Sequence, residues 1–493
     1  MEPSLSDRTA RASIWTVGSK LVSKAIDLVT LLCLARMLGP SDFGLVAMAM
    51  TSVLITEAIF ELPVGAALIR LPDITKDMFD TALTLGLLRG VLISALLCLL
   101  AYPLALFYQE PKLTALVCVL SLAPVLRGLR SPRMILFTRR LDFRPDFVMD
   151  LTAKLTSLFV AAGAAWLTGS YWAIAAGTIA GPALTVSMSY IYSPLWPHLT
   201  LKELHRFAQM IGWNMVSQIL QSLNWQLEKL LLPRFVDLAS FGHYSVANDI
   251  TGVPFQAIVQ PLFRPFLVAF AHMGTTEKLG EAYLKASSAI VLLVAPVLLL
   301  ISILSDVVVD VLLGPSWTNT AYLLRYLPLI AILALPTIPI PSLAMTVNRM
   351  HFVTIKNMSD LASKAVLVIV LGYIAGMQGI VVAQALAATI SLIVSMFIIK
   401  SMIGLSLMRQ CKELTRHFLP MFLMGLFIIP EVYVRNYDLG FVRFTSLACL
   451  MGAMSIIAYL AGIVLTFKMT NARRPAEYDL IVRLFKHKFR PAV

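Results

Sequence analysis

Charged residues are scarce in this chain, and the short motifs of common catalytic sites are missing. Only 14% of the 493 residues are charged, whereas 58% are hydrophobic and the mean hydropathy is +0.82. This composition excludes both a soluble globular domain and a disordered chain. Asp-x-Asp, Gly-Lys-Ser/Thr and His-Glu-x-x-His do not occur, so a sugar-nucleotide transferase, an ATP-driven machine and a zinc peptidase are not indicated. We therefore expect a protein that is not an enzyme.

Cysteine is equally rare. The five cysteines lie singly in apolar stretches, without Cys-x-x-Cys spacing and without nearby pairs of histidines. Zinc ligands and a disulfide framework both require such groupings, so neither is indicated. We expect the cysteines to be packing residues and the chain to hold no metal.

Long apolar runs are what the chain has in abundance. A helix needs about 20 mainly apolar residues to cross a bilayer, and about 14 such segments fit the sequence. They are predicted at residues 14–35, 43–66, 80–107, 113–133, 147–168, 171–193, 208–232, 241–271, 284–304, 318–347, 352–374, 377–399, 415–433 and 441–467. The connections are short, so we expect an all-α integral membrane protein without a folded domain outside the bilayer.

Basic residues flank these segments unevenly. With the N-terminus in the cytosol, the inner connections carry about five times as many Lys and Arg residues as the outer ones, which orients both termini inward. The net charge of +13 then reflects membrane orientation and not binding to nucleic acid. Residues 468–493 are predicted to form a basic amphipathic tail on the cytosolic surface, with a solvated tail as the alternative.

The sequence also repeats itself. Trp15, Arg36 and Gly44 return as Trp213, Arg234 and Gly242, each 198 positions later. Two parallel halves of six spans follow, with a central cavity between pseudo-symmetric lobes. We predict an N-lobe at 1–200, a C-lobe at 201–400, two further helices within 401–467 and the tail at 468–493.

Charged side chains lie inside several predicted spans, where they cost free energy unless they pair or line a wet cavity. Lys20, Lys24 and Asp27 share one helical face, and Glu57 and Glu61 lie one turn apart on the next span, at a depth that predicts a Lys–Glu pair. Other charged residues inside the predicted spans are candidates for the same reason. The cationic ones are Lys20, Lys24, Arg127, Arg130, Lys154 and Lys364, and the acidic ones, as charge partners or coupling-ion sites, are Asp27, Glu57, Glu61, Asp150, Asp249 and Asp360.

A net positive cavity would attract an anionic headgroup, and a pyrophosphate fits best because Lys and Arg donate charge-assisted hydrogen bonds to it. The seventh span adds amide and indole groups on one face, which suit a sugar. These sugar-contacting candidates are Trp213, Asn214, Gln218, Gln221, Asn224 and Trp225. Contacts between helices are the alternative role for this face.

The segment Leu34–Leu45, with the sequence LARMLGPSDFGL, resembles the signature A-R-x-L-G-P-x-D-F-G of the polysaccharide transporter (Wzx-like) family. That family belongs to the multidrug/oligosaccharidyl-lipid/polysaccharide exporter superfamily. The segments Gly169–Ile174 and Phe137–Phe143 are similar to that family as well. The likeness covers essentially the whole chain and is greatest toward translocases of lipid-linked exopolysaccharide units, of colanic acid or succinoglycan type.

The resemblance implies a MATE-like fold of 14 helices and a flippase of the bacterial inner membrane. It would move undecaprenyl-pyrophosphate-linked oligosaccharides by alternating access for exopolysaccharide or lipopolysaccharide synthesis. No cofactor is implied beyond coupling to Na⁺ or H⁺, and the expected partners are membrane lipids, a polysaccharide polymerase and chain-length or export proteins. The alternatives are a drug or metabolite exporter of the same superfamily and a membrane-embedded polymerase or ligase.

Overall fold

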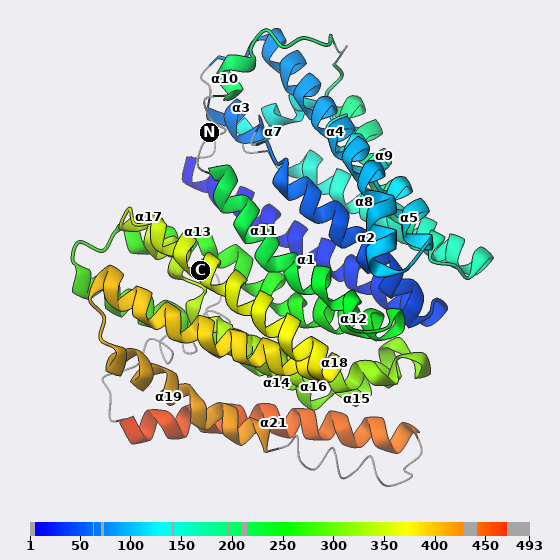
Figure 1. The fold of residues 1–493 in the computed structure, drawn as a ribbon. Helices are drawn as coiled ribbons and strands as arrows, with labels where there is room; N and C mark the ends of the chain where they lie inside the picture. Colours follow the sequence, from blue (N-terminus) through cyan, green and yellow to red (C-terminus); the bar gives the residue numbers. More distant parts are fainter. Residues whose placement is uncertain are drawn as a thin grey trace, which may run out of the picture. The chain divides into compact units, whose positions relative to one another are not determined.

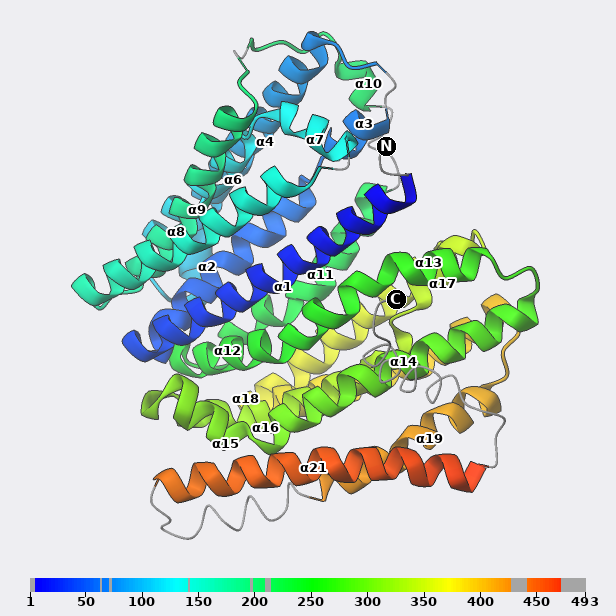
Figure 2. The same ribbon diagram turned by 180° about the vertical axis from the view of Figure 1, so that it is seen from behind.

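The computed structural model is helical throughout the residues that it describes, which are 5–62, 64–70, 73–140, 142–195, 198–208, 214–426 and 441–470. These residues form two compact units. The first unit contains the described residues up to Val246 together with Gly372–Met377, and the second contains the remainder. Figures 1 and 2 show the helices from two opposite sides.

The first unit consists of long helices joined by short turns. In chain order they are α1 (Leu5–Met37), α2 (Pro40–Ile59), α3 (Val64–Arg70), α4 (Lys76–Tyr108), α5 (Lys112–Leu120), α6 (Leu122–Gly128), η1 (Pro132–Met134), α7 (Ile135–Arg139), α8 (Arg144–Thr168), α9 (Trp172–Tyr192), α10 (Leu204–Ala208), α11 (Asn214–Leu231), η2 (Leu232–Arg234) and the start of α12 (Leu238–Pro254). Small residues let neighbouring helices approach closely. At Gly177 of α9, for example, an added Cβ would lie 2.7 Å from the Ser157 carbonyl oxygen of α8.

The second unit continues from α12. Its further elements are η3 (Phe255–Val259), η4 (Gln260–Leu262), α13 (Phe263–Ala271), α14 (Thr276–Ile303), α15 (Ser305–Val308), η5 (Val309–Leu313), η6 (Pro315–Trp317), α16 (Thr318–Ala334), η7 (Leu335–Thr337), α17 (Ile340–Thr346), α18 (His351–Ile403), α19 (Leu407–Gly425) and α21 (Phe441–Thr470). Side chains of α14 such as Ile290, Val294 and Leu298 form part of its apolar core. A buried ion pair between Arg325 and Asp306 ties α16 to α15.

The expected all-helical membrane fold is confirmed. Helices occupy most of the described part of every predicted span. Within the described residues, nine helices are long and apolar enough to cross a membrane, or up to ten if the bent pair Lys112–Gly128 and Pro132–Arg139 counts as one span. The chain is therefore a multi-pass membrane protein. The compact units do not follow the predicted domain limits, which stay a prediction.

Two helix boundaries bear directly on the sequence analysis. The predicted break between spans 352–374 and 377–399 is confirmed, because α18 loses helical geometry at Ala375 and Gly376. Gly376 has a φ of 53° and a ψ of −131°, a conformation that is open to glycine and costly for residues with a Cβ. The predicted span 43–66 is wrong as a single helix, since α2 ends at Ile59 and α3 begins at Val64.

A pair of glycines brings α2 and α12 into backbone contact. A Cβ on Gly44 would lie 2.1 Å from the Leu238 carbonyl oxygen, and one on Gly242 would lie 1.8 Å from the Pro40 carbonyl oxygen. Gly44 and Gly242 are 198 residues apart, as are Pro40 and Leu238. The contact is therefore reciprocal, with each half of the sequence repeat offering the same glycine and the same carbonyl to the other.

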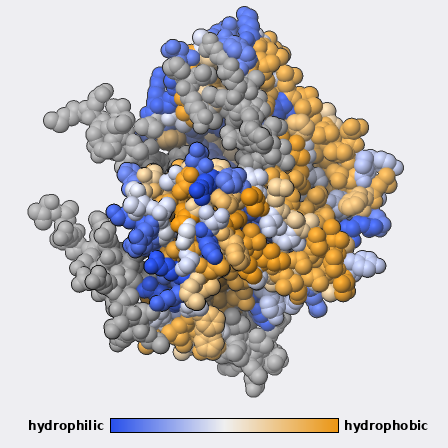
Figure 3. Space-filling view, turned by 60° about the vertical axis from the view of Figure 1, so that its left-hand side comes forward, coloured by the Kyte–Doolittle hydropathy of each residue, from blue (hydrophilic) through white to orange (hydrophobic). Residues whose placement is uncertain are grey.

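The outer surface matches a lipid environment. Apolar side chains cover large areas of the face shown in Figure 3. Large hydrophobic residues are strongly exposed in both units, including Trp166, Leu167 and Ile191 in the first and Met408 and Phe418 of α19 in the second. In water such patches would be a liability, whereas in hydrocarbon they face a solvent of matching polarity.

Candidate functional site

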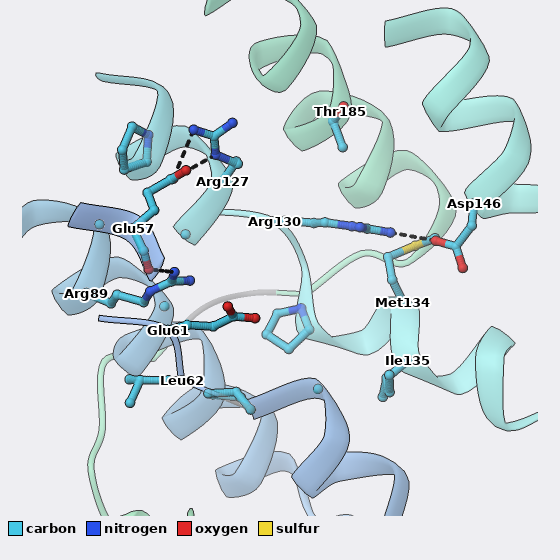
Figure 4. A pocket seen from close by; sticks show the side chains of 18 of the residues that line it. Glu57, Glu61, Leu62, Arg89, Arg127, Arg130, Met134, Ile135, Asp146 and Thr185 are labelled. Carbon is cyan, nitrogen blue, oxygen red and sulfur yellow. Dashed lines mark hydrogen bonds and ion pairs between the residues drawn. The ribbon is translucent and has the colours of Figure 1, made fainter. Parts of the chain in front are cut away.

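A polar cavity of about 1200 Å³ lies in the first unit. Its lining residues come from α1, α2, α3, α4, α6, η1, α7, α8, α9 and α11 and from the connections after α2, α6 and α7. Figure 4 shows the charged groups that face it, with arginines from α4 and α6 near acidic residues from α2 and α8. The cavity is large enough for a ligand of drug size or above.

Close packing of α4 on α6 positions two of these arginines. A Cβ on Gly128 would lie 2.2 Å from the Gly86 carbonyl oxygen, and one on Gly90 would lie 2.7 Å from the Pro124 carbonyl oxygen. Arg89 is flanked by the α4 glycines, and Arg127 precedes Gly128 on α6. Because the two backbones touch, both guanidinium groups reach the same wall of the cavity.

Each arginine of this wall has a defined partner. Arg127 binds the Glu57 carboxylate of α2, with its Nη2 2.9 Å and its Nε 3.0 Å from Oε1. Arg89 donates from Nη2 to the Glu57 backbone oxygen at 2.9 Å, while its buried Nε has no hydrogen-bond partner. Arg130 binds Asp146 of α8 at 2.5 Å. Glu57 therefore sits between two arginines, accepting from one through its side chain and from the other through its backbone.

The cavity of the first unit is balanced in formal charge, whereas the net positive lining predicted for a central cavity between the two lobes stays a prediction. The ionisable residues that line the cavity are Lys20, Arg89, Arg127, Arg130, Glu57, Glu61, Asp146 and Asp150. Four cations thus face four carboxylates, and the formal charges cancel. The basic residues of the fourth span are evident in the sequence, but their proximity to Asp146 and to the two glutamates of the second span depends on the tertiary structure.

The predicted Lys–Glu pair is wrong. Lys20 lines the cavity and is exposed, but it forms no ion pair with any residue in the described ranges. Glu57 pairs with Arg127 instead, because α6 brings a guanidinium closer than α1 brings an amine. Glu61 also lines the cavity, from the turn after α2 and not from a continuing helix.

Asp27 of α1 pairs with one lysine of its own helix and with one of α8. Asp27 accepts from Lys24 at 3.3 Å and from Lys154 at 2.5 Å. Asp150 of α8, a cavity residue, accepts a hydrogen bond from the Ser23 hydroxyl. Lys24, Asp27 and Lys154 are absent from the cavity lining, so their part in substrate binding stays a prediction while their part in joining α1 to α8 is visible.

Two acidic candidates and one basic candidate lie in the second unit. Asp360 is buried on α18 and accepts from Lys356 at 2.6 Å, while its other carboxylate oxygen has no hydrogen-bond partner. Lys364 lies one turn further along the same helix, and Asp249 is exposed on α12. None of the three lines the cavity of the first unit.

The sugar-contacting candidates on α11 divide into three groups. Gln221 and Trp225 line the cavity, and Trp225 is 57% exposed. Asn224 is buried and does not line it. Asn214 and Gln218 lie on α11 with undescribed side chains, and Trp213 lies outside the described residues.

Arg89, Gln226 and Asp146 are cavity residues that the sequence analysis missed. Arg89 lies in the middle of α4, a span whose hydropathy is high enough to hide a single arginine. An intramembrane arginine is itself a signal of function, and that signal could have identified it. Among the described residues, no group of three or more His, Cys, Asp or Glu side chains could hold a metal ion.

Comparison with known proteins agrees with the sequence resemblance. Residues 33–322, more than half of the chain, match the model of the family described as polysaccharide biosynthesis protein. The lipopolysaccharide biosynthesis protein WzxC of Escherichia coli is 24% identical over 450 residues, which cover 89% of each chain. The succinoglycan biosynthesis transport protein ExoT of Rhizobium meliloti is 24% identical over 321 residues, and the match spans 64% of this chain and 65% of ExoT.

A solved structure of the lipid II flippase MurJ, in an inward closed conformation, shares the fold. The two superpose with a TM-score of 0.71 at 14% identity, covering 94% of this chain and all of the MurJ chain. The predicted MATE-like helical architecture and the resemblance to the polysaccharide transporter family are both confirmed. By its match over residues 33–322, this chain belongs to the polysaccharide biosynthesis protein family.

Proposed function

We propose that this protein is a flippase for undecaprenyl-pyrophosphate-linked oligosaccharide units, acting by alternating access in exopolysaccharide or lipopolysaccharide synthesis. The observation that carries the proposal is the family match over more than half of the chain, together with relatives named for polysaccharide biosynthesis and succinoglycan transport. The fold shared with a lipid II flippase supports the same type of transport. No covalent bond is made or broken in this scheme.

The cavity supplies the groups that such a headgroup needs. Arg89, Arg127 and Arg130 offer planar guanidinium forks that match phosphate oxygens, and the exposed Lys20 adds a point charge. On α11, Gln221 can hydrogen-bond to hydroxyl groups, and the exposed indole of Trp225 offers a flat apolar platform for a sugar ring. The ligand would thus lie with its diphosphate toward α4 and α6 and its sugars toward α11.

The setting and the energy source belong to the same proposal. We place the protein in the bacterial inner membrane with both termini in the cytosol, in keeping with the uneven distribution of basic residues. Coupling would use Na⁺, H⁺ or the membrane potential, with the carboxylates of Asp27, Asp150 and Asp360 as candidate sites. The polymerase and the export proteins of the same polymer would act on the product.

A cavity with balanced formal charge is compatible with an exporter of cationic drugs as well as with a flippase, so the test must separate these two functions. Purified protein in liposomes should move a fluorescent lipid-linked oligosaccharide diphosphate between leaflets, whereas a lipid with a neutral headgroup should stay in place. A double variant of Arg127→Gln and Arg130→Gln should lose this activity by at least about tenfold, since two charge-assisted contacts disappear. Export of cationic dyes without lipid movement would contradict the proposal and favour the exporter.

A further inference from the structure

The acidic residues of the cavity hold two of its arginines apart. Figure 4 shows the guanidinium group of Arg127 pointing toward Glu57 of α2 and that of Arg130 pointing the opposite way, toward Asp146 of α8. The two arginines are three residues apart and leave the end of α6 within one turn of each other. Without their carboxylate partners, both side chains would be long enough to converge on one ligand.

Both ion pairs lie where an incoming anion can replace the carboxylate. The side chains of Arg127 and Arg130 are 44% and 42% exposed, so water reaches both pairs. Solvent-accessible pairs contribute little net stability, about 0–1 kcal/mol each. An anion that enters the cavity therefore needs only a modest advantage over a carboxylate to take its place.

Repulsion between carboxylates and phosphates favours such an exchange. The lining carries equal numbers of cationic and acidic groups, so a diphosphate that simply added itself would leave the cavity with excess negative charge. In a site partly shielded from water, that excess is unfavourable. The repulsion is reduced if the carboxylates turn away from the arginines, so that the phosphates and not the carboxylates lie beside the guanidinium groups.

We propose that Glu57 and Asp146 are internal counter-ions that occupy the arginines in the empty cavity and are displaced by the diphosphate of the substrate. This inference rests on the proposed function, because it assumes a diphosphate ligand. Arg89 is the fixed anchor of the site. Its Nη2 is held by a backbone oxygen, its buried Nε has no partner, and no described carboxylate neutralises it.

Two properties follow from this arrangement. A diphosphate can engage Arg127 and Arg130 at once, whereas a single phosphate competes with one carboxylate at a time, so two linked phosphates gain from the higher effective concentration of the second group. The same carboxylates favour release, because they rebind the arginines when the ligand leaves. The counter-ions thus select for diphosphates and prevent them from binding too tightly for turnover.

The test is a calorimetric titration of the full-length protein in detergent with inorganic pyrophosphate, and separately with inorganic phosphate. The variant Glu57→Gln keeps the shape of the side chain and removes its charge. We expect it to bind pyrophosphate about fivefold more tightly than the wild type, because Arg127 no longer has a competing carboxylate. Asp146→Asn should act in the same direction through Arg130 and provides a second variant if Glu57→Gln fails to fold.

Two controls make the result specific. Asp77→Asn removes a carboxylate from the exposed pair with Lys202, at 3.7 Å and outside the cavity, and should leave pyrophosphate affinity unchanged. In an Arg127→Gln background, Glu57→Gln should no longer tighten binding, since the arginine that it releases is missing. Arg89→Gln should weaken binding with both carboxylates in place.

The outcomes separate this inference from the proposed function. Unchanged or weaker pyrophosphate binding in Glu57→Gln and Asp146→Asn, equal affinity for phosphate and pyrophosphate, or no binding by the wild type would overturn the counter-ion role even if the liposomes move lipid-linked sugars. Tighter binding in both variants with the expected loss of the effect in Arg127→Gln would support it even if the liposome assay were negative.

Discussion

Helices α1 and α11 occupy equivalent positions in the sequence repeat, yet they carry different chemistry. At the spacing of 198 residues, Lys20 of α1 corresponds to Gln218 of α11, and Asp27 corresponds to Trp225. Lys20 of α1 lines the cavity, and Asp27 pairs with Lys154 of α8. The described polar residues of α11 that face the cavity, Gln221, Ser222 and Gln226, are neutral, and beside them lies an indole.

The contact between α2 and α12 shows the opposite behaviour. Here the two halves of the repeat keep the same residues, and Gly44 and Gly242 make reciprocal backbone contacts. Backbone packing is thus symmetric where helices cross, while side-chain chemistry is asymmetric where a ligand would lie. That combination suits a ligand with one anionic end and one neutral, hydroxyl-rich end, held by a duplicated scaffold.

The largest effect is expected from breaking the symmetric contact. Gly44→Val and Gly242→Val each place a side chain where a carbonyl oxygen lies about 2 Å from the first added carbon. Overpacking of this kind costs about 1–3 kcal/mol or more, so both variants should lose several degrees of melting temperature by comparable amounts. Thermal unfolding in detergent measures this. Gly163→Ala, on α8 with open space around it, is the matched control and should be neutral.

A smaller loss of stability is expected when a charge of α1 is removed. Asp27→Asn leaves Lys24 and Lys154 close together without a shared carboxylate, which should lower stability by about 1 kcal/mol, because the three side chains are 35–37% exposed. The same thermal assay reports it, with Asp77→Asn as the control for an exposed pair. Adding Lys154→Met should restore part of the loss, and a double variant no better than Asp27→Asn would show that the lysines do not repel each other.

Replacing the indole that α11 offers to the cavity should affect transport more than stability. Trp225→Ala removes an indole that is 57% exposed, so little packing is lost and the melting temperature should change by no more than the control variants. Movement of a lipid-linked oligosaccharide in liposomes should fall several-fold, by the loss of one aromatic contact worth about 1 kcal/mol. Affinity for inorganic pyrophosphate should not change. A fall in pyrophosphate affinity would mean that the two ends of the ligand are not separated as proposed.

The smallest effect concerns how the two equivalent helices begin. Asp42 accepts from the Gly39 backbone at the start of α2, whereas Asp237 accepts from the backbone and hydroxyl of Ser240 at the start of α12. Partial burial tends to raise the pKa of Asp237, but the hydrogen bonds from Ser240 and neighbouring backbone groups outweigh it and lower that pKa.

A lowered pKa means that the ionised carboxylate stabilises the folded state above the ordinary pKa of aspartate, and that this contribution disappears as the pH falls through the folded value. Asp237→Asn should therefore melt slightly below the wild type at neutral pH and approach it in acid. The difference between the two proteins, measured as melting temperature against pH, isolates this one group. A difference independent of pH would contradict it.

Much of the fold was accessible from the sequence because the bilayer leaves few choices. Apolar length predicted nine or ten of the helices that are long and apolar enough to cross a membrane among the described residues, and Gly376 marks the break in α18 at the expected place. The boundary of α2 was wrong because apolarity continues across a break in the helix, and hydropathy does not register where hydrogen bonding stops. The site was less accessible, since Lys20, Arg127, Arg130, Gln221 and Trp225 were found while Arg89 and Asp146 were missed.

By itself, the sequence determined that this is a helical multi-pass membrane protein with an internal repeat and with charges that lipid cannot solvate. These properties depend on composition and spacing along the chain, which folding does not change. Only the tertiary structure decided which charges meet. The partner of Glu57 is Arg127 and not Lys20, and the cavity is electrically balanced and not positive, because these pairings depend on how closely separate helices approach one another.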